Sequence, residues 1–308
     1  MSVPRLRYGY ITNGLTHHRL EDALRLLADL GYDGCAITLD HAHLDPFAPG
    51  LAAEVERIGG LARALGLALS IETGARFLLD PRRKHEPTLL SEETAGRARR
   101  LDFLGRAIAV ARDLGAPLVS FWSGVAPAGA ALTTSWARLQ EGVETVVGRA
   151  EASGVRLGFE PEPGMLVETV ADYRALRAAL DSPTLGLTLD LGHCLLTEPE
   201  PPEQVVRQVA PVLANVHAED TRRPVHEHLL FGQGEMRYEQ ILAALIAIEY
   251  RGLVNVELSR DSHRGPEVAT AALAYLKTAE RHAAPPGSAI HLRPDGGGNE
   301  WSATSRPA

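Results

Sequence analysis

The sequence predicts an α/β protein with a single (β/α)₈ TIM barrel and a disordered C-terminal tail. Eight short runs rich in Val, Ile and Leu alternate with segments of helical periodicity along most of the 308 residues. This alternation is the pattern of parallel strands joined by crossover helices. The stretch 6–282 has the length of one such barrel, which typically needs about 250 residues. A doubly wound open sheet is the competing fold, but no GxGxxG follows the first run, where a dinucleotide-binding fold places it.

Each predicted strand is followed by a predicted helix. The strands are 6–12, 34–39, 68–72, 118–122, 156–160, 185–190, 213–217 and 253–257. After the first of them, Leu20, Ala23, Leu24, Leu27 and Leu30 recur at three- and four-residue intervals and therefore share one helical face. We expect residues 1–282 to form the barrel and residues 283–308, which are rich in Pro and Gly, to be a flexible tail.

Composition and charge exclude several classes of protein. The chain has 31 Lys and Arg against 39 Asp and Glu, a formal net charge of −8, which argues against wrapping nucleic acid. No run approaches the roughly 20 uninterrupted apolar residues of a membrane span, and the N-terminus lacks the apolar core of a secretory signal. Cys35 and Cys194 cannot build a disulfide framework. We expect a cytoplasmic protein that binds neither membrane nor nucleic acid.

Two predicted loops are longer than a plain barrel needs. One follows the third strand, at 73–93, and the other follows the seventh, at 218–236. Loops after strands lie on the face of a barrel where ligands bind, and loops this long are often functional. The first carries the cations Arg76, Arg82, Arg83, Lys84 and His85, which either bind a phosphate or carboxylate or simply offset the acidic surface.

The last four predicted strands end in residues of one chemical kind: Glu160, Asp190, His217 and Glu257. A single strand-end carboxylate is commonly a helix N-cap or a surface group. Barrel geometry, however, brings all four ends to one rim, where unpaired buried charges are costly. Three carboxylates and one imidazole suit a divalent cation. The sequence therefore predicts one metal site for Mn²⁺, Mg²⁺, Co²⁺ or Zn²⁺.

Three further histidines are candidates for the same cavity. His193 follows Asp190 by three residues, one helical turn, so it is expected to bind substrate or a second metal unless it only makes a hydrogen bond at a helix start. His226 and His228 stand on alternate positions before a glycine turn. They either take part in the site or belong to an ordinary surface loop. Trp122, at the end of the fourth strand, is expected either to line the pocket, where its ring can pack on the apolar face of a bound molecule, or to lie at the rim of the core.

These motifs resemble the xylose isomerase-like TIM-barrel superfamily, the sugar phosphate isomerase/epimerase group that includes D-tagatose 3-epimerase, hydroxypyruvate isomerase and endonuclease IV. The resemblance covers nearly the whole barrel. Its most specific segments are FEPEPG at 159–164, LTLDLGH at 187–193, NVHAED at 215–220 and FGQG at 231–234. It implies that Glu160, Asp190, His217 and Glu257 bind the metal, and that His193 and an arginine, Arg222 or Arg223, hold substrate oxygens. His228 and Glu72 are further expected substrate residues, and His226 a second-metal or substrate residue.

The DNA-repair branch of this superfamily is matched only in part. Its trinuclear zinc site includes positions that match His193, His226 and His228, but it also takes histidines from the ends of the third and fourth strands. This sequence has Glu72-Thr73 and Trp122-Ser123 there. A full trinuclear site is therefore not expected, and the charge of −8 opposes DNA binding.

The resemblance implies a metal-dependent sugar or sugar phosphate isomerase or epimerase that transfers protons through a metal-stabilised enediolate. Glu160 and Glu257 would flank the substrate carbon, one removing a proton and the other returning it. Two alternatives remain open: a metal-dependent dehydratase or lyase that acts on a hydroxy-keto acid, and a non-catalytic, metal-stabilised scaffold protein. The expected partner is a small sugar-like molecule, and a homodimer is considered.

Overall fold

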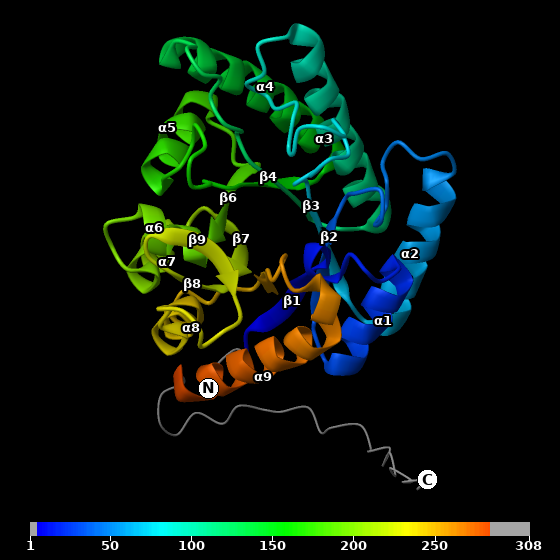
Figure 1. Ribbon diagram of the computed structural model, residues 1–308, viewed down its shortest axis with the longest axis vertical. Coiled ribbons are helices and arrows are strands. Elements are labelled where there is room, and N and C mark those ends of the chain that lie inside the picture. The colour runs from blue at the N-terminus through cyan, green and yellow to red at the C-terminus, as the bar shows by residue number, and fades with distance from the viewer. Residues whose placement is uncertain (1–4, 284–308) are drawn as a thin grey trace, which may run out of the picture.

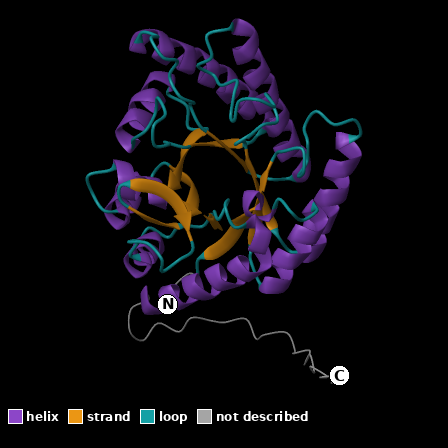
Figure 2. Cartoon of the chain, in the orientation of Figure 1, coloured by secondary structure: helices purple, strands orange, loops and turns teal. Residues whose placement is uncertain are grey.

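The barrel predicted from the sequence is confirmed. The computed structural model describes residues 5–283, and eight parallel strands close in the order β1-β10-β7-β6-β5-β4-β3-β2. Figure 2 shows the ring of strands inside a layer of helices. The strands are β1 (Arg7–Ile11), β2 (Gly34–Thr38), β3 (Ala68–Glu72), β4 (Leu118–Phe121), β5 (Arg156–Phe159), β6 (Leu185–Asp190), β7 (Leu213–Ala218) and β10 (Leu253–Val256). Each predicted strand agrees with the observed one to within a residue at either end.

Helices follow the strands around the outside of the barrel (Figure 1). They are α1 (Leu20–Leu30), α2 (Leu51–Leu65), α3 (Thr94–Leu114), α4 (Leu132–Ser153), α5 (Val170–Leu180), α6 (Leu191–Thr197), α7 (Pro202–Val209), α8 (Tyr238–Ala247) and α9 (Gly265–Ala283), with short 3₁₀ turns η1 (Thr12–Leu15) and η2 (Ser262–Arg264). The leucines predicted to share a face of α1 include Leu20, Leu24 and Leu27, which are buried. Between residues 5 and 283 no helix is both long and apolar enough to cross a membrane. The predicted tail lies outside the described residues, except for Ala283, which ends α9.

The loop predicted at 218–236 contains a small antiparallel hairpin that the sequence did not reveal. Its strands are β8 (Asp220–Arg222) and β9 (Val225–Leu229), which are short and polar and lack the apolar alternation of a predictable strand. The buried carboxylate of Asp220 accepts four backbone N–H groups, from Thr221, Gly232, Gly234 and Met236, at 2.8–3.1 Å. These bonds fix the segment after the hairpin, so the hairpin projects over the barrel mouth from a rigid base.

The barrel interior beneath the mouth is polar. Asn255 donates to Asn215 at 2.9 Å, and Asn215 donates to Glu72 at 3.3 Å. A Cβ added at Gly9 would lie 2.1 Å from the Asn255 amide oxygen, so glycine at that position leaves room for this chain of amides. These buried groups hydrogen-bond to one another, except that the Asn255 amide oxygen has no partner among the described residues. The amide chain supports the strand ends where the charged residues gather.

Candidate metal centre and active site

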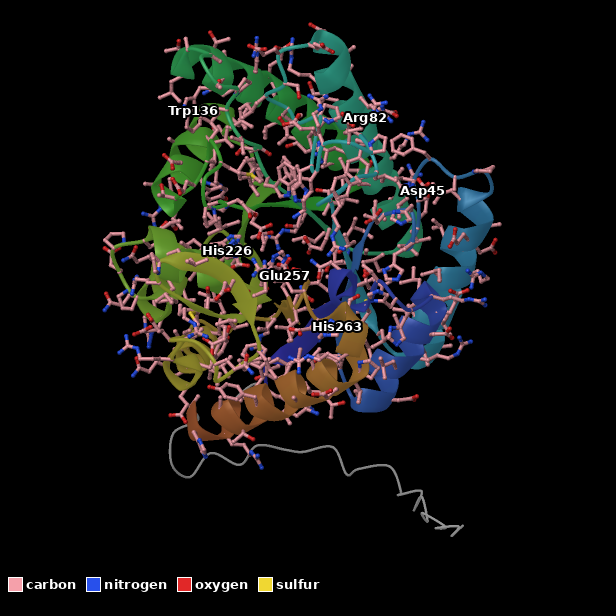
Figure 3. All side chains as sticks on the ribbon, viewed as in Figure 1. Asp45, Arg82, Trp136, His226, Glu257 and His263 are labelled. Carbon is pink, nitrogen blue, oxygen red and sulfur yellow. The ribbon has the colours of Figure 1, made fainter. Side chains whose placement is uncertain are left out.

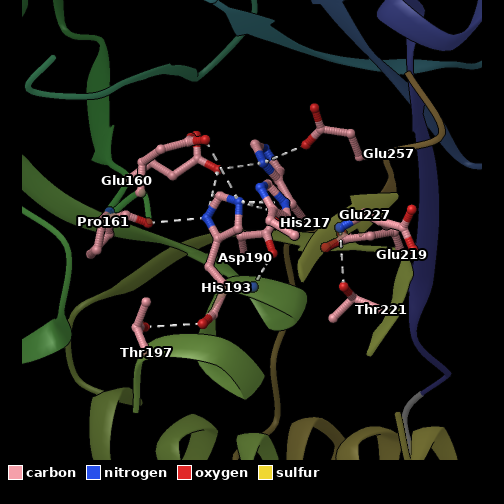
Figure 4. Close-up of polar contacts among 12 residues, drawn as sticks. Glu160, Pro161, Asp190, His193, Thr197, His217, Glu219, Thr221, Glu227 and Glu257 are labelled. Carbon is pink, nitrogen blue, oxygen red and sulfur yellow. Dashed lines mark hydrogen bonds and ion pairs between the residues drawn. The ribbon is translucent and has the colours of Figure 1, made fainter. Parts of the chain in front are cut away.

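The structure brings together the four residues that the sequence placed at strand ends. Asp190 ends β6 and His217 lies in β7, whereas Glu160 and Glu257 directly follow β5 and β10. One ligand atom of each lies within 4.8 Å of the others, a spacing that could hold one metal ion. His217 Nδ1 is 3.1 Å from Glu160 Oε1 and 3.4 Å from Glu257 Oε2. Figure 4 shows the two glutamates on either side of His217. We call these four residues the quartet.

The donor atoms of the quartet fit a divalent cation. Asp190 caps α6 by accepting the amide of His193 on Oδ1 at 2.8 Å, while its buried Oδ2 has no hydrogen-bond partner among the described residues. Asn13 donates to Glu257 Oε1 at 2.8 Å, which leaves Oε2 toward His217. The nearest positive partner of Asp190 Oδ2 is His193 Nε2 at 3.8 Å, and a buried carboxylate oxygen without a hydrogen bond is costly unless a cation meets it. Mixed oxygen and imidazole donors suit Mn²⁺, Mg²⁺, Co²⁺ or Zn²⁺.

The electrostatics of the cluster show how strongly it attracts positive charge. Burial by itself would lower the pKa of His217, but Glu72 and Glu160 outweigh burial and raise it well above its usual value. Burial likewise opposes the charged form of His193, yet Asp190 and Glu162 raise its pKa to about 9. Burial raises the pKa of Glu160 to about 7, partly offset by His217. Without a metal, protons on the imidazoles balance the carboxylates, and binding a cation would release them.

Glu72, at the end of β3, lies beneath the quartet. The sequence suggested a substrate residue, and the side chain does border the cavity. Its nearest contact, however, is with His217, whose Nε2 lies 3.1 Å from Glu72 Oε1. His217 Nδ1 faces Glu160 and Glu257, and Nε2 lies between Glu72 Oε1 and Asn215 Nδ2, 3.0 Å from the latter. With a metal on Nδ1, the ring would carry its proton on Nε2, toward Glu72. A carboxylate on the far nitrogen of a ligand histidine fixes the ring and raises its basicity.

We predict that Glu72→Gln lowers the affinity for Mn²⁺ about 10- to 100-fold, because the amide orients His217 without a negative charge. Titration calorimetry measures the change. Ser120→Ala is the matched control, because Ser120 lies in the same interior layer and its hydroxyl meets Thr188 at 2.9 Å rather than a quartet residue. Equal Mn²⁺ affinity in Glu72→Gln and the wild type would contradict this role.

A second group of histidines stands beside the quartet. His193 Nε2 lies 3.2 Å from His226 Nε2, and the His226 and His228 rings are 4.8 Å apart. Burial and His193 together lower the pKa of His226 to about 4. Two carboxylates, Glu162 and Glu219, lie close to these rings, and neither was predicted from the sequence to belong to the site. Sets that could hold a metal are Glu162 with His193 and His226, and Glu219 with His226 and His228.

Both missed carboxylates had a sequence signal. Glu162 lies two residues beyond Glu160 in the FEPEPG exit, and Glu219 lies two residues beyond His217. Side chains two apart on an extended segment point to the same side, which is how Glu162 reaches the cavity. Glu219 is fully buried and both of its oxygens lack a hydrogen-bond partner within residues 5–283. Burial, with Asp190 nearby, raises the pKa of Glu219 well above its usual value.

A cavity of about 490 Å³ opens above the quartet. In Figure 3, His226 and Glu257 lie over the middle of the barrel, whereas Trp136 and Arg82 lie at its periphery. The predicted residues that border the cavity are Glu72, Trp122, Glu160, His193, His217, His226, His228 and Glu257. Asp190 lies below them, fully buried.

The two predicted arginines are placed elsewhere. Arg222 and Arg223 are exposed, and neither is among the described residues that border the cavity. Arg223 instead lines a separate hollow with Pro201 and Arg237. Arg222 ends β8 and Arg223 lies in the turn that follows, and both are exposed because a hairpin replaces the expected loop. The cations that border the cavity are Arg76, Lys84 and Arg260.

Comparison with known families agrees with the fold and the motifs. The family described as the xylose isomerase-like TIM barrel matches residues 24–279. The chain belongs to this family. Among curated members of similar sequence, the uncharacterized protein MJ1311 of Methanocaldococcus jannaschii is 31% identical over 144 residues, which are 44% of this chain and 47% of that protein.

Longer matches in this family are to sugar epimerases. L-Ribulose-5-phosphate 3-epimerase UlaE of Shigella flexneri is 24% identical over 253 residues, 80% of this chain and 84% of that protein. A solved structure of L-ribulose 3-epimerase superposes with a TM-score of 0.73 at 23% identity and covers 91% of this chain and 96% of its own. At this identity the structural likeness shows the shared fold.

Proposed function

We propose that this protein is a divalent-metal-dependent sugar isomerase/epimerase. It would remove a proton from the carbon next to a ketose carbonyl, form an enediolate, and return the proton to the opposite face of that carbon or to the neighbouring carbon. The observation that carries the proposal is the placement of Glu160 and Glu257 on either side of His217, at the floor of a cavity of about 490 Å³. Two carboxylates that face each other across a bound carbon can remove a proton from one face and return it to the other.

The quartet would hold the cation, and the other residues have separate tasks. A divalent ion bound there supplies Lewis-acid stabilisation for negative charge that develops on the substrate oxygens. Glu160 and Glu257 hold and transfer the proton. Asn13 fixes the carboxylate plane of Glu257 through its 2.8 Å hydrogen bond. His193 lies with Nδ1 3.1 Å from the Pro161 carbonyl and Nε2 3.2 Å from His226 Nε2, and the pair of rings at the cavity wall would contact substrate hydroxyls.

The substrate class follows from the cavity and its charged rim. The floor carries carboxylates and imidazoles that suit vicinal oxygens, while Arg76, Lys84 and Arg260 border the cavity. Within the described residues, Arg76 and Lys84 have no carboxylate partner at ion-pair distance, so both are available to an anionic group. The relatives named for L-ribulose 5-phosphate and L-ribulose support a five-carbon ketose or its phosphate.

A solvent-exchange experiment tests the proposal. The protein is incubated in D₂O with Mn²⁺ and a panel of ketopentoses and ketohexoses, each with and without phosphate. We expect deuterium at the carbon beside the carbonyl, with the epimer accumulating, and we expect uptake to stop when the metal is chelated. The absence of uptake across the panel contradicts the proposal. Loss of water from a hydroxy-keto acid, detected by the absorbance of an unsaturated product, would instead support a dehydratase.

A further inference from the structure

The third loop forms one wall of the cavity. This segment, residues 73–93, joins β3 to α3 without regular secondary structure. It lines the cavity with Thr73, Arg76, Lys84 and His85. A loop of this length contains many backbone N–H and C=O groups that no helix or sheet pairs, so other parts of the molecule must hold it in shape.

One buried side chain of α3 holds the loop at three points. The guanidinium of Arg100, only 3% exposed, donates from Nε to the Pro87 carbonyl at 2.8 Å, from Nη1 to Thr73 at 3.3 Å and from Nη2 to His85 at 2.5 Å. Its Cζ lies 4.7 Å from the centre of the Trp122 ring. No carboxylate of the described chain lies within ion-pair distance of Arg100. The Arg100 Cζ also lies 5.5 Å from the centre of the Phe103 ring. A buried cation that meets carbonyls and ring faces but no carboxylate is expensive, and it persists here because it satisfies several loop carbonyls together.

The contacts of Arg100 lie where the loop backbone is strained. Ala75 and His85 have φ values of 56° and 68°, in the left-handed region that side chains other than glycine's disfavour. Such conformations cost energy and persist only where the surroundings determine them. The His85 amide donates to the Arg76 carbonyl at 2.6 Å, and its ring packs edge-on against Trp122 with centroids 5.4 Å apart. The guanidinium of Arg100 therefore contacts both the strained backbone at His85 and the ring of Trp122, against which the His85 ring packs.

We infer that Arg100 is a positioning residue that fixes the third loop and Trp122 as the wall of the cavity, and so sets the affinity for an anionic substrate. It does not touch the quartet. Arg76 and Lys84 reach the cavity from backbone that Arg100 holds, so their position depends on it. The guanidinium spreads its N–H donors over three nitrogens of a rigid plane, whereas the three N–H groups of an ammonium leave one atom, so lysine cannot reach all three of these separated carbonyls at once.

Arg100→Lys tests this inference, with Arg106→Lys as the matched control. Arg106 lies on the same helix but is exposed and pairs with Asp102 at 2.9 Å. We expect hydrogen exchange of the loop amides in Arg100→Lys to be about tenfold faster, with trypsin cutting earlier after Arg82, Arg83 or Lys84. In Arg106→Lys, both the exchange rate of the loop amides and the rate of trypsin cleavage should equal those of the wild type. Unchanged exchange and proteolysis in Arg100→Lys would overturn the inference.

A kinetic readout separates positioning from a general loss of structure, and it alone rests on the proposed function. With L-ribulose 5-phosphate as probe, we expect KM to rise about tenfold while kcat and Mn²⁺ affinity stay within about twofold of the wild type. A fall in kcat with KM unchanged, or weaker Mn²⁺ binding, overturns the inference. If the wild type does not turn over this probe, the proposed function fails for it, and the exchange data still decide the role of Arg100.

A measurement on the wild-type protein covers the case in which Arg100→Lys does not fold. If Arg100 ties the loop to α3, the amides of Leu78 and His85, which are hydrogen-bonded within the loop, should exchange together with those of α3 as one unit. Loop amides that exchange independently of α3 overturn the inference without any variant.

Discussion

Glu160→Gln and Glu257→Gln are each expected to lower the rate of deuterium uptake by about 10²- to 10⁴-fold, the usual contribution of a proton-transferring side chain. A glutamine keeps the shape of the side chain but cannot accept the substrate proton. In the wild type the two carboxylates lie 3.1 and 3.4 Å from His217. A glutamine oxygen can still accept a hydrogen bond from His217, so we expect each variant to fold. Solvent exchange followed by NMR measures the rate, and the position of the deuterium distinguishes epimerisation from isomerisation.

Because both glutamates also belong to the quartet, the measurement needs a control for metal loss. Each variant is assayed over a range of Mn²⁺ up to saturation, and its bound metal is determined. Glu239→Gln, at an exposed position on α8 that pairs with His282 and does not border the cavity, should leave deuterium uptake unchanged. If either quartet variant regains the wild-type rate at saturating Mn²⁺, that glutamate only binds metal and does not carry the proton.

Removing the metal is expected to lower the melting temperature, and Asp190→Asn is expected to abolish that difference. A ligand at about 100 times its Kd adds about 2.7 kcal/mol to the free energy of unfolding, roughly 5 °C for a domain of this size. In Asp190→Asn the Oδ1 cap of α6 can remain, but the metal-free protein should be somewhat less stable than the metal-free wild type, because burial opposes the charged form of Asp190 yet His193, 3.8 Å from Oδ2, outweighs it and keeps the pKa of Asp190 below its usual value. Calorimetry with and without Mn²⁺ checks both statements.

Asp220→Asn gives the opposite pattern and serves as the matched control. Asp220 accepts four backbone N–H groups, two on each oxygen, and the amide of asparagine would face two of those donors with its own N–H₂. We expect a loss of about 3 kcal/mol or more in the free energy of unfolding. The Mn²⁺-dependent rise should remain. A metal effect that survives in Asp190→Asn, or that disappears in Asp220→Asn, would argue against the quartet as the binding site.

The sequence predicted most of the barrel because its strands are apolar and its helices periodic, and both patterns are local. The quartet was predictable because parallel strands of a closed barrel carry their ends to one rim. Arg222 and Arg223 were expected to reach the substrate, but they do not border the cavity, because Arg222 ends β8 and Arg223 lies in the turn after it. The hairpin has no apolar pattern in the sequence that would reveal it. The contact of Glu72 with His217 depends on pairings between distant strands, which spacing along the chain does not encode.

The four residues of the quartet all come from the second half of the barrel, between β5 and β10, whereas η1 and the third loop belong to the first half. The metal-binding quartet and the loop that carries Arg76 and Lys84 therefore lie in separate stretches of the chain, although His193, His226 and Arg260 add cavity residues from the second half. If the first half of the barrel were replaced by that of a relative, we expect the preference for sugars to change while the quartet still binds its metal. This requires that the new segment has Asn and Glu at the positions of Asn13 and Glu72, which contact Glu257 and His217. Such modular inheritance lets one ancestral barrel diversify its substrates without reinventing its reaction.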